Sequence, residues 1–311
     1  MVLNLFQRGR VEEWCLSVLG SGTLVPLRSE AGGQMSDVFR FDCDNSGPCA
    51  VKVRPGSGAR TRRCLQLQTV AADAGFPCAR PLTGVALLGP GIVVNAESWC
   101  PGGEMTTDGD LVLAGRSAAL LADLAAILEN EFPAGLGTPP PWMHWNRTGG
   151  GLWPPNPTVD AMDQDRVPGH VTATARAVSE RLAKSSLPLV VGHGDWESQN
   201  LRWNGTTACV VHDWDSLVAL PEAAIVGAAS GAFASATTPT LSSLDASEAF
   251  IDHYEQARGR VFSLEERQIA WAASLWPALH NARGESLFQS PPTVLEALTR
   301  QASERLQRAG A

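Results

Sequence analysis

Two short polar segments in the second half of the chain contain residue types that bind metal ions and move protons. HGDWESQN at 193–200 contains Asp195 and Asn200, and HDWD at 212–215 contains Asp213. Carboxylate and amide oxygens suit a hard cation such as Mg²⁺, which rarely takes a full protein cage. A carboxylate that binds no metal can instead accept a proton from a hydroxyl group, as general bases do.

The elements predicted around these segments are three short strands. Apolar residues 189–191 form the first, and residues 201–203 and 209–212 form two more. The last two are joined around Asn204-Gly205, a strong hairpin signal. A hairpin fixes register, so the residues just before and just after it are brought to the same end.

This register places Asp195 and Asn200 close to Asp213. An Asp followed five positions later by Asn, and by a further Asp after a hairpin, is the layout of kinase catalytic and metal-binding loops. A His/Asp metal site that includes His193 and His212 is the alternative. No third or fourth nitrogen or sulfur ligand appears nearby in the sequence, which disfavours Zn²⁺.

The rest of the chain divides into a strand-rich part and a helix-rich part. The predicted strands of the first part are 24–27, 38–43, 49–53, 83–88 and 92–97, with helices at 5–19 and 60–74. The second part has helical patterns at 115–131, at 170–185 and over most of 245–308. The sequence therefore predicts an α+β protein with two lobes: a small β-rich lobe over 1–98 and a larger, mainly helical lobe over 99–311.

HGDWESQN and HDWD resemble the HGD(L/F/W)xxxN and D(F/W)(D/E) signatures of the aminoglycoside phosphotransferase family, the small-molecule kinases of the protein-kinase-like fold. The resemblance implies that Asp195 is the catalytic base towards a substrate hydroxyl. It implies that Asn200 and Asp213 hold the Mg²⁺ ions that bridge the nucleotide phosphates. His193 would orient the loop.

The first part of the chain resembles the same family in the expected order. AGGQMSDVFRF at 31–41 is similar to the family's phosphate-binding loop, with Gly33, Ser36 and Asp37 in the matching places, although Asn is commoner where Asp37 stands. In CAVKV, Lys52 would bind the nucleotide phosphates. VVNAESWCPGG resembles the hinge, where backbone groups near Ser98 and Cys100 would meet the adenine. The resemblance implies nucleotide binding by all of these residues.

One part of the family pattern is missing. The helix after the lysine strand should contain a glutamate that pairs with the lysine. Between Lys52 and Gly75 the only acidic residue is Asp73, at the far end of that helix. Two alternatives remain open: Gln68 as a neutral partner, or an acid elsewhere in the chain.

Composition excludes several other classes of protein. The 311 residues are 44% hydrophobic and 18% charged, which is typical of a globular protein. A net charge of −8 disfavours nucleic acid as a partner. Seven cysteines without CxxC spacing, no secretory signal and no membrane span predict a cytoplasmic protein with reduced thiols and no membrane partner.

The sequence thus predicts a phosphotransferase that moves the γ-phosphate of ATP or GTP to a hydroxyl of a small molecule. An antibiotic, such as an aminoglycoside or another sugar-bearing compound, is the first expectation for the acceptor. The alternatives are a metabolite kinase of the choline, homoserine, methylthioribose or fructosamine type, and a nucleotide-binding pseudokinase, suggested by the absent glutamate. Metal-dependent hydrolysis ranks last.

Two groups of residues have open interpretations. Trp142, Trp145 and Trp153 either stack on a sugar or nucleoside ring or pack a long loop onto the helical lobe. A second group consists of acidic residues that either line a pocket for a cationic substrate or form a solvated helix face; they are Asp245, Glu248, Asp252 and Glu255.

Overall fold

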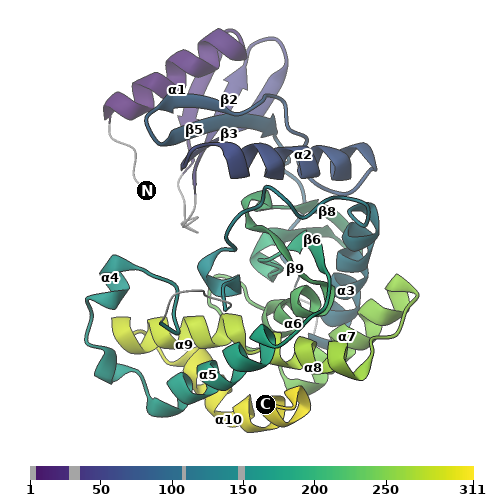
Figure 1. Cartoon of the computed structure of the whole chain (residues 1–311). Helices are drawn as coiled ribbons and strands as arrows, with labels where there is room; N and C mark the ends of the chain where they lie inside the picture. The colour runs from purple at the N-terminus through teal and green to yellow at the C-terminus, as the bar shows by residue number, and fades with distance from the viewer. Residues whose placement is uncertain (1–4, 28–35, 107–109, 146–150) are drawn as a thin grey trace. The chain divides into compact units, whose positions relative to one another are not determined.

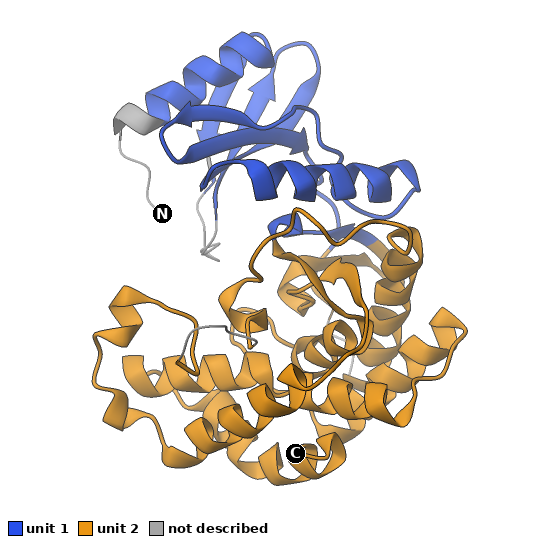
Figure 2. Ribbon diagram, viewed as in Figure 1, with its two compact units in different colours: residues 1–103, 209–215 blue, residues 104–208, 216–311 orange. Residues whose placement is uncertain are grey.

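A computed structural model describes residues 5–27, 36–106, 110–145 and 151–311 (Figure 1). The chain forms two compact units, coloured separately in Figure 2. Unit 1 comprises residues 1–103 and 209–215, and unit 2 comprises residues 104–208 and 216–311. The predicted α+β class is confirmed, with a sheet in the N-terminal region and helices in the C-terminal region.

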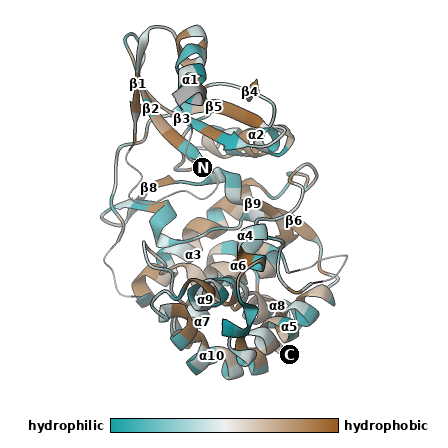
Figure 3. Cartoon of the chain, turned by 90° about the vertical axis from the view of Figure 1, so that its left-hand side faces the viewer, coloured by the Kyte–Doolittle hydropathy of each residue, from teal (hydrophilic) through white to brown (hydrophobic). Residues whose placement is uncertain are grey.

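Unit 1 is built on a five-stranded antiparallel sheet with two helices. The strands run in the order β1-β2-β3-β5-β4. Their bounds are Gly22–Pro26 for β1, Asp37–Cys43 for β2, Gly47–Pro55 for β3, Ala86–Gly89 for β4 and Ile92–Ser98 for β5; the helices are α1, Leu5–Val18, and α2, Ala59–Asp73. Figure 3 shows the hydrophobic stretch of β5 within this sheet.

The core of unit 1 packs α1 against the sheet. Val11 and Cys15 of α1 are fully buried among apolar side chains of the strands, which include Phe41, Val51 and Val53. Burial raises the pKa of the Cys15 thiol to about 12, so this cysteine is a protonated, unreactive core residue at neutral pH. The predicted hairpin at 38–53 is confirmed, because β2 and β3 pair from Asp37 with Val53 to Cys43 with Gly47.

Unit 2 is mainly helical, and one of its helices, α6, is buried among the others. The helices are α3, Asp110–Ile127, α4, Pro157–Asp160, α5, Gly169–Ala183, α6, Glu222–Ala232, α7, Leu244–Arg258, α8, Leu264–Ala273, α9, Trp276–Phe288, and α10, Thr293–Ala309. Every residue of α6 after Glu222 is buried. A helix that is hydrophobic on all sides belongs in the centre of a domain. Four helices in the predicted region 245–308 confirm that the tail is mostly helical.

Two pairs of short strands flank the predicted catalytic segment. β6, Leu189–His193, pairs with β9, Leu217–Pro221, in antiparallel register, with His193 opposite Leu217. β7, Leu201–Asn204, and β8, Thr207–Val211, form the predicted hairpin. Neither β9 nor α6 was predicted from the sequence. Within the described part of the chain, no helix has the length and apolar character that crossing a bilayer requires.

A buried histidine on α9 should make the stability of unit 2 depend on pH. Burial, reinforced by the charge of Arg283, lowers the pKa of His280 from 6.5 to about 4. The unfolded chain therefore binds a proton that the folded chain does not bind, and the free energy of unfolding should fall as the pH drops from about 6.5 to about 4.

The measurement is urea unfolding across this pH range for the wild-type chain and for His280→Gln. The glutamine variant should show a smaller fall in the free energy of unfolding between pH 6.5 and 4. Parallel curves for the two proteins would contradict the depressed pKa of His280.

Candidate active site

The predicted catalytic segment begins where β6 ends, in a turn stabilised by backbone and ring contacts. The side chain of His193 is buried, and its Nδ1 accepts a hydrogen bond from the backbone N–H of Asp195 at 3.2 Å. The backbone N–H of Gly194 donates to the carbonyl of Ser216 at 2.8 Å. The ring of Trp196 meets the His193 ring edge to face, with centroids 5.5 Å apart. These contacts agree with a role for His193 in orienting the loop.

Asp195 and Asn200 lie together, as the spacing predicts. Asn200 ends a short 3₁₀ turn, Ser198–Asn200. Its amide nitrogen donates both to the backbone carbonyl of Asp195 and to the carboxylate Oδ2 of Asp195, each at 2.9 Å. With Nδ2 used in this way, the Asn200 side chain presents its oxygen, Oδ1, as the atom for a metal ligand.

Lys52 on β3 lies in a buried ion pair. Its side-chain nitrogen is 2.7 Å from Oε1 of Glu97 on β5, and both side chains are buried. The other carboxylate oxygen of Glu97 accepts a hydrogen bond from Gln68 of α2 at 3.0 Å. Burial alone lowers the pKa of Lys52, but the carboxylates of Glu97 and Asp215 outweigh it, so the pKa is raised and the lysine is cationic at neutral pH.

The missing helix glutamate thus has a counterpart on a strand. Of the two alternatives left open by the sequence, the structure shows the acid elsewhere: Glu97 pairs with Lys52, and Gln68 donates a hydrogen bond to Glu97. The signal in the sequence is a single acidic residue, Glu97, at the end of the mostly apolar segment 92–97. That signal becomes informative only when the register of β3 against β5 is known.

Asp213 lies between two residues, Val211 and Asp215, that each contact another part of unit 1. Its φ of 59° is the left-handed conformation that non-glycine residues adopt rarely, and such strain concentrates at functional sites. Before it, the backbone N–H of Val211 donates to the carbonyl of Pro77 at 2.7 Å. After it, Asp215 forms a buried ion pair with Arg54 at 2.8 Å. Arg54 was not predicted from the sequence as a residue of the site.

The donor atoms fit the metal that the family pattern implies. Asn200 offers an amide oxygen and Asp213 a carboxylate, which are hard ligands of the kind that Mg²⁺ binds. Asn200 belongs to unit 2 and Asp213 to unit 1. The predicted proximity of Asp213 to Asp195 and Asn200 therefore stays a prediction.

Comparison with known proteins identifies the family. A sequence profile described as the phosphotransferase enzyme family matches residues 27–223. The chain belongs to this family. The match confirms the predicted resemblance and the predicted enzyme class, a phosphotransferase. No curated protein matches the sequence.

Three solved structures with a similar fold are named as kinases, kinase family proteins or phosphotransferases. An amicoumacin kinase in complex with AMP-PNP, Ca²⁺ and Ami has a TM-score of 0.64 at 9% identity, over 98% of this chain and 96% of that chain. The GDP complex of an aminoglycoside 2′-phosphotransferase has a TM-score of 0.59 at 10% identity, over 99% of both chains. A choline/ethanolamine kinase family protein from Mesorhizobium loti has a TM-score of 0.51 at 16% identity, over 99% and 94%. These similarities confirm the protein-kinase-like fold.

Three of the predicted nucleotide-binding residues of this phosphotransferase, Asp37, Lys52 and Ser98, lie on strands of unit 1. Asp37 begins β2, Ser36 precedes it, and Gly33 lies outside the described residues. Ser98 ends β5, where its backbone N–H donates to the carbonyl of Arg80 at 2.8 Å. The thiol of Cys100 lies 3.8 Å from the Ser98 carbonyl. Their contacts with a nucleotide remain predictions.

Three tryptophans named in the sequence analysis contact protein groups. The indole N–H of Trp142 donates to the carbonyl of Gly194 at 2.9 Å, which fixes the turn before Asp195. Trp145 and Trp153 contact Trp276 of α9, with ring centroids 6.4 and 5.8 Å apart. These contacts favour the packing interpretation for Trp145 and Trp153.

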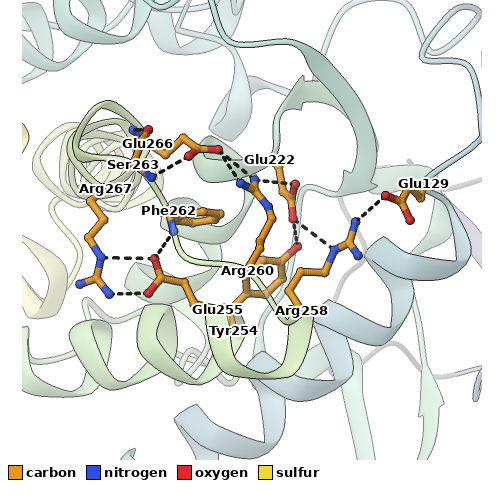
Figure 4. A network of polar contacts seen from close by, with 10 residues as sticks. All are labelled: Glu129, Glu222, Tyr254, Glu255, Arg258, Arg260, Phe262, Ser263, Glu266 and Arg267. Atoms are coloured by element: carbon orange, nitrogen blue, oxygen red, sulfur yellow. Dashed lines mark hydrogen bonds and ion pairs between the residues drawn. The ribbon is translucent and has the colours of Figure 1, made fainter.

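Three of the four acidic residues in the C-terminal helices are paired with arginines. Arg267 binds both Asp252 and Glu255, and Arg308 binds Glu248 at 2.8 Å. Figure 4 shows the pair of Arg267 with Glu255. It also shows a neighbouring group of contacts, in which Glu222 accepts hydrogen bonds from Tyr254 and Arg260. Arginine neutralises these carboxylates, so they do not form the cationic-substrate pocket that was one of the two interpretations.

Proposed function

We propose that this phosphotransferase transfers the γ-phosphate of ATP or GTP to a hydroxyl of a small molecule, with Asp195 as the base. The observation that carries the proposal is the pair of hydrogen bonds from Asn200 to Asp195. These bonds fix the carboxylate of Asp195, two residues after the end of β6. The carboxylate lies beside the Asn200 amide, whose oxygen suits a metal ion. A base must be held where it can reach the proton that it abstracts.

The catalytic contributions of the chain are positioning and charge neutralisation. Lys52, which its acidic neighbours keep cationic, binds the nucleotide phosphates. Backbone groups near Gly33, Ser36 and Asp37 bind the same phosphates. Groups near Ser98 and Cys100 meet the base of the nucleotide. Mg²⁺, when bound by Asn200 and Asp213, neutralises charge on the phosphates. Asp195 accepts the proton of the substrate hydroxyl through its carboxylate.

An antibiotic is our first proposal for the acceptor, because amicoumacin and an aminoglycoside are named for two of the similar structures. A small hydroxylated metabolite is the second candidate. It is favoured by the similarity to a choline/ethanolamine kinase family protein. A pseudokinase is less favoured because Lys52 has the acidic partner whose absence from α2 suggested that role.

Release of ADP or GDP with Mg·ATP or Mg·GTP tests the proposal. The acceptor panel contains amino-sugar antibiotics, macrolides, nucleoside antibiotics and hydroxylated amines such as choline, and Asp195→Ala is the control. We expect release that depends on one class of acceptor and disappears in the control. Equal release without any acceptor, or release that survives in Asp195→Ala, would contradict the assignment.

A further inference from the structure

The register of two neighbouring strands places an acid beside the phosphate-binding lysine. β3 and β5 pair in antiparallel register, with Lys52 opposite Asn95 and Ala50 opposite Glu97. Residues opposite each other share a face of the sheet, and so do alternate residues along a strand. Lys52, Asn95 and Glu97 therefore project from the same face, which allows the 2.7 Å ion pair between Lys52 and Glu97.

The helix contributes a neutral residue at this place. Gln68 of α2 is 1% exposed, and its amide nitrogen donates both to Glu97 and to the backbone carbonyl of Ala79 at 2.7 Å. The one acidic residue of α2, Asp73, lies at the end of the helix and pairs with the exposed Arg80. Gln68 thus orients the carboxylate of Glu97 and adds no charge.

We propose that Glu97 is the residue that positions Lys52 for phosphate binding, and that the sheet supplies this acid in place of the helix. The proposal rests on the proposed function and assigns one more residue to it. A buried carboxylate and a buried ammonium each require the other, because an unpaired charge is costly to bury. Glu97 therefore determines where the lysine nitrogen lies.

The location of Glu97 on β5 determines which elements of unit 1 fix the position of the Lys52 side chain. Both members of the pair lie on hydrogen-bonded strands of one sheet, and α2 contributes only the hydrogen bond from Gln68 to Glu97. Glu97 is also directly followed by Ser98, whose side chain accepts a hydrogen bond from the Arg80 backbone at 2.8 Å. Lys52 is thereby linked, through Glu97, to the segment proposed to meet the nucleotide base.

Replacement of Glu97 by Gln should misplace Lys52 and weaken phosphate transfer. We expect kcat/KM for the nucleotide to fall on the order of 10²-fold, since small displacements of positioning groups cost about this much. The matched control is Asp73→Asn, which removes the acid of α2 and should leave kinetics unchanged. Thermal unfolding of each variant checks that unit 1 is folded.

Transfer of the acid back to the helix distinguishes positioning from a structural role. In Glu97→Gln with Gln68→Glu, the carboxylate moves to a site within hydrogen-bond distance of the original one and the net charge is restored. We expect this double variant to recover at least half of the loss on a logarithmic scale. In a Lys52→Ala background, Glu97→Gln should cause no further loss, because the two residues act as a unit.

The kinetics and nucleotide affinities of these variants test whether Glu97 positions Lys52. Wild-type kinetics in a folded Glu97→Gln variant would overturn the inference, as would an additive loss in the Lys52→Ala background. Nucleotide affinity, measured by calorimetry on the same variants, separates this inference from the proposed function. A wild-type chain that binds nucleotide but phosphorylates no acceptor would contradict the function, and the affinity ratio of Glu97→Gln to wild type would still test Glu97.

Discussion

Replacement of Asp195 by Asn is expected to lower kcat on the order of 10² to 10⁴-fold, the usual contribution of a general base. Asparagine has almost the same shape as aspartate, and its side-chain oxygen can still accept the hydrogen bond from Asn200. The amide cannot take up the proton of a substrate hydroxyl. The variant should therefore bind nucleotide normally and lose the chemical step.

Steady-state kinetics with the acceptor identified in the panel would measure this loss. The nucleotide KM should change little, because Asp195 is not among the groups proposed to bind the phosphates. Asp123→Asn, which alters an exposed carboxylate on α3 of the same unit, is the matched control and should behave as wild type. A kcat within about threefold of wild type in Asp195→Asn would remove Asp195 from the mechanism.

The catalytic segment was predictable because its determinants are local in sequence. The turn after β6 requires His193 and Asp195 to be two residues apart, and the bonds from Asn200 to Asp195 span five residues. Such contacts are present in a motif before any tertiary structure is known.

The lysine partner was not predictable for the opposite reason. Lys52 and Glu97 are separated by the whole of α2 and β4, and nothing local distinguishes Glu97 from a solvated acid near a strand end. Only the pairing of Lys52 with Asn95 places Glu97 on the same face. The same holds for Arg54, whose partner Asp215 comes from a distant part of the chain.

The buried helix α6 was missed because its residues carry no helical pattern. Its sequence, EAAIVGAASGA, is apolar almost throughout, so there is no polar face to reveal a period of 3.6 residues. Its two glycines also argue against a helix when propensity alone is considered. Packing explains both glycines, because Gly227 and Gly231 lie where the backbone of α8 and of the residue after it comes close.

Replacement of Gly227 by Ala should strongly destabilise unit 2. A Cβ atom at this position would lie 2.6 Å from the carbonyl carbon of Ala270 in α8, and one at Gly231 would lie 3.0 Å from the carbonyl carbon of Ser274. These neighbours are backbone atoms, so they cannot move as a side-chain end does. The two helices must separate, and we expect a loss of at least about 1–3 kcal/mol in the free energy of unfolding, as for overpacked cores.

Urea unfolding of Gly227→Ala beside Gly284→Ala measures this effect with a matched control. Gly284 is also a helical glycine, on α9, and a Cβ there would meet no atom within 4 Å. Its replacement should be neutral or stabilise by roughly 0.5–1 kcal/mol, since alanine is the better helix former. Equal midpoints for the two variants would contradict the close packing of α6 on α8.

The destabilised variant should also show how this packing supports the site. α6 begins directly after β9, and β9 holds His193 opposite Leu217. A displacement of α6 would therefore move the strand that positions the turn before Asp195. We expect folded Gly227→Ala to lose kcat as well as stability, whereas Gly284→Ala retains both, so that the glycines of α6 support catalysis without contacting a substrate.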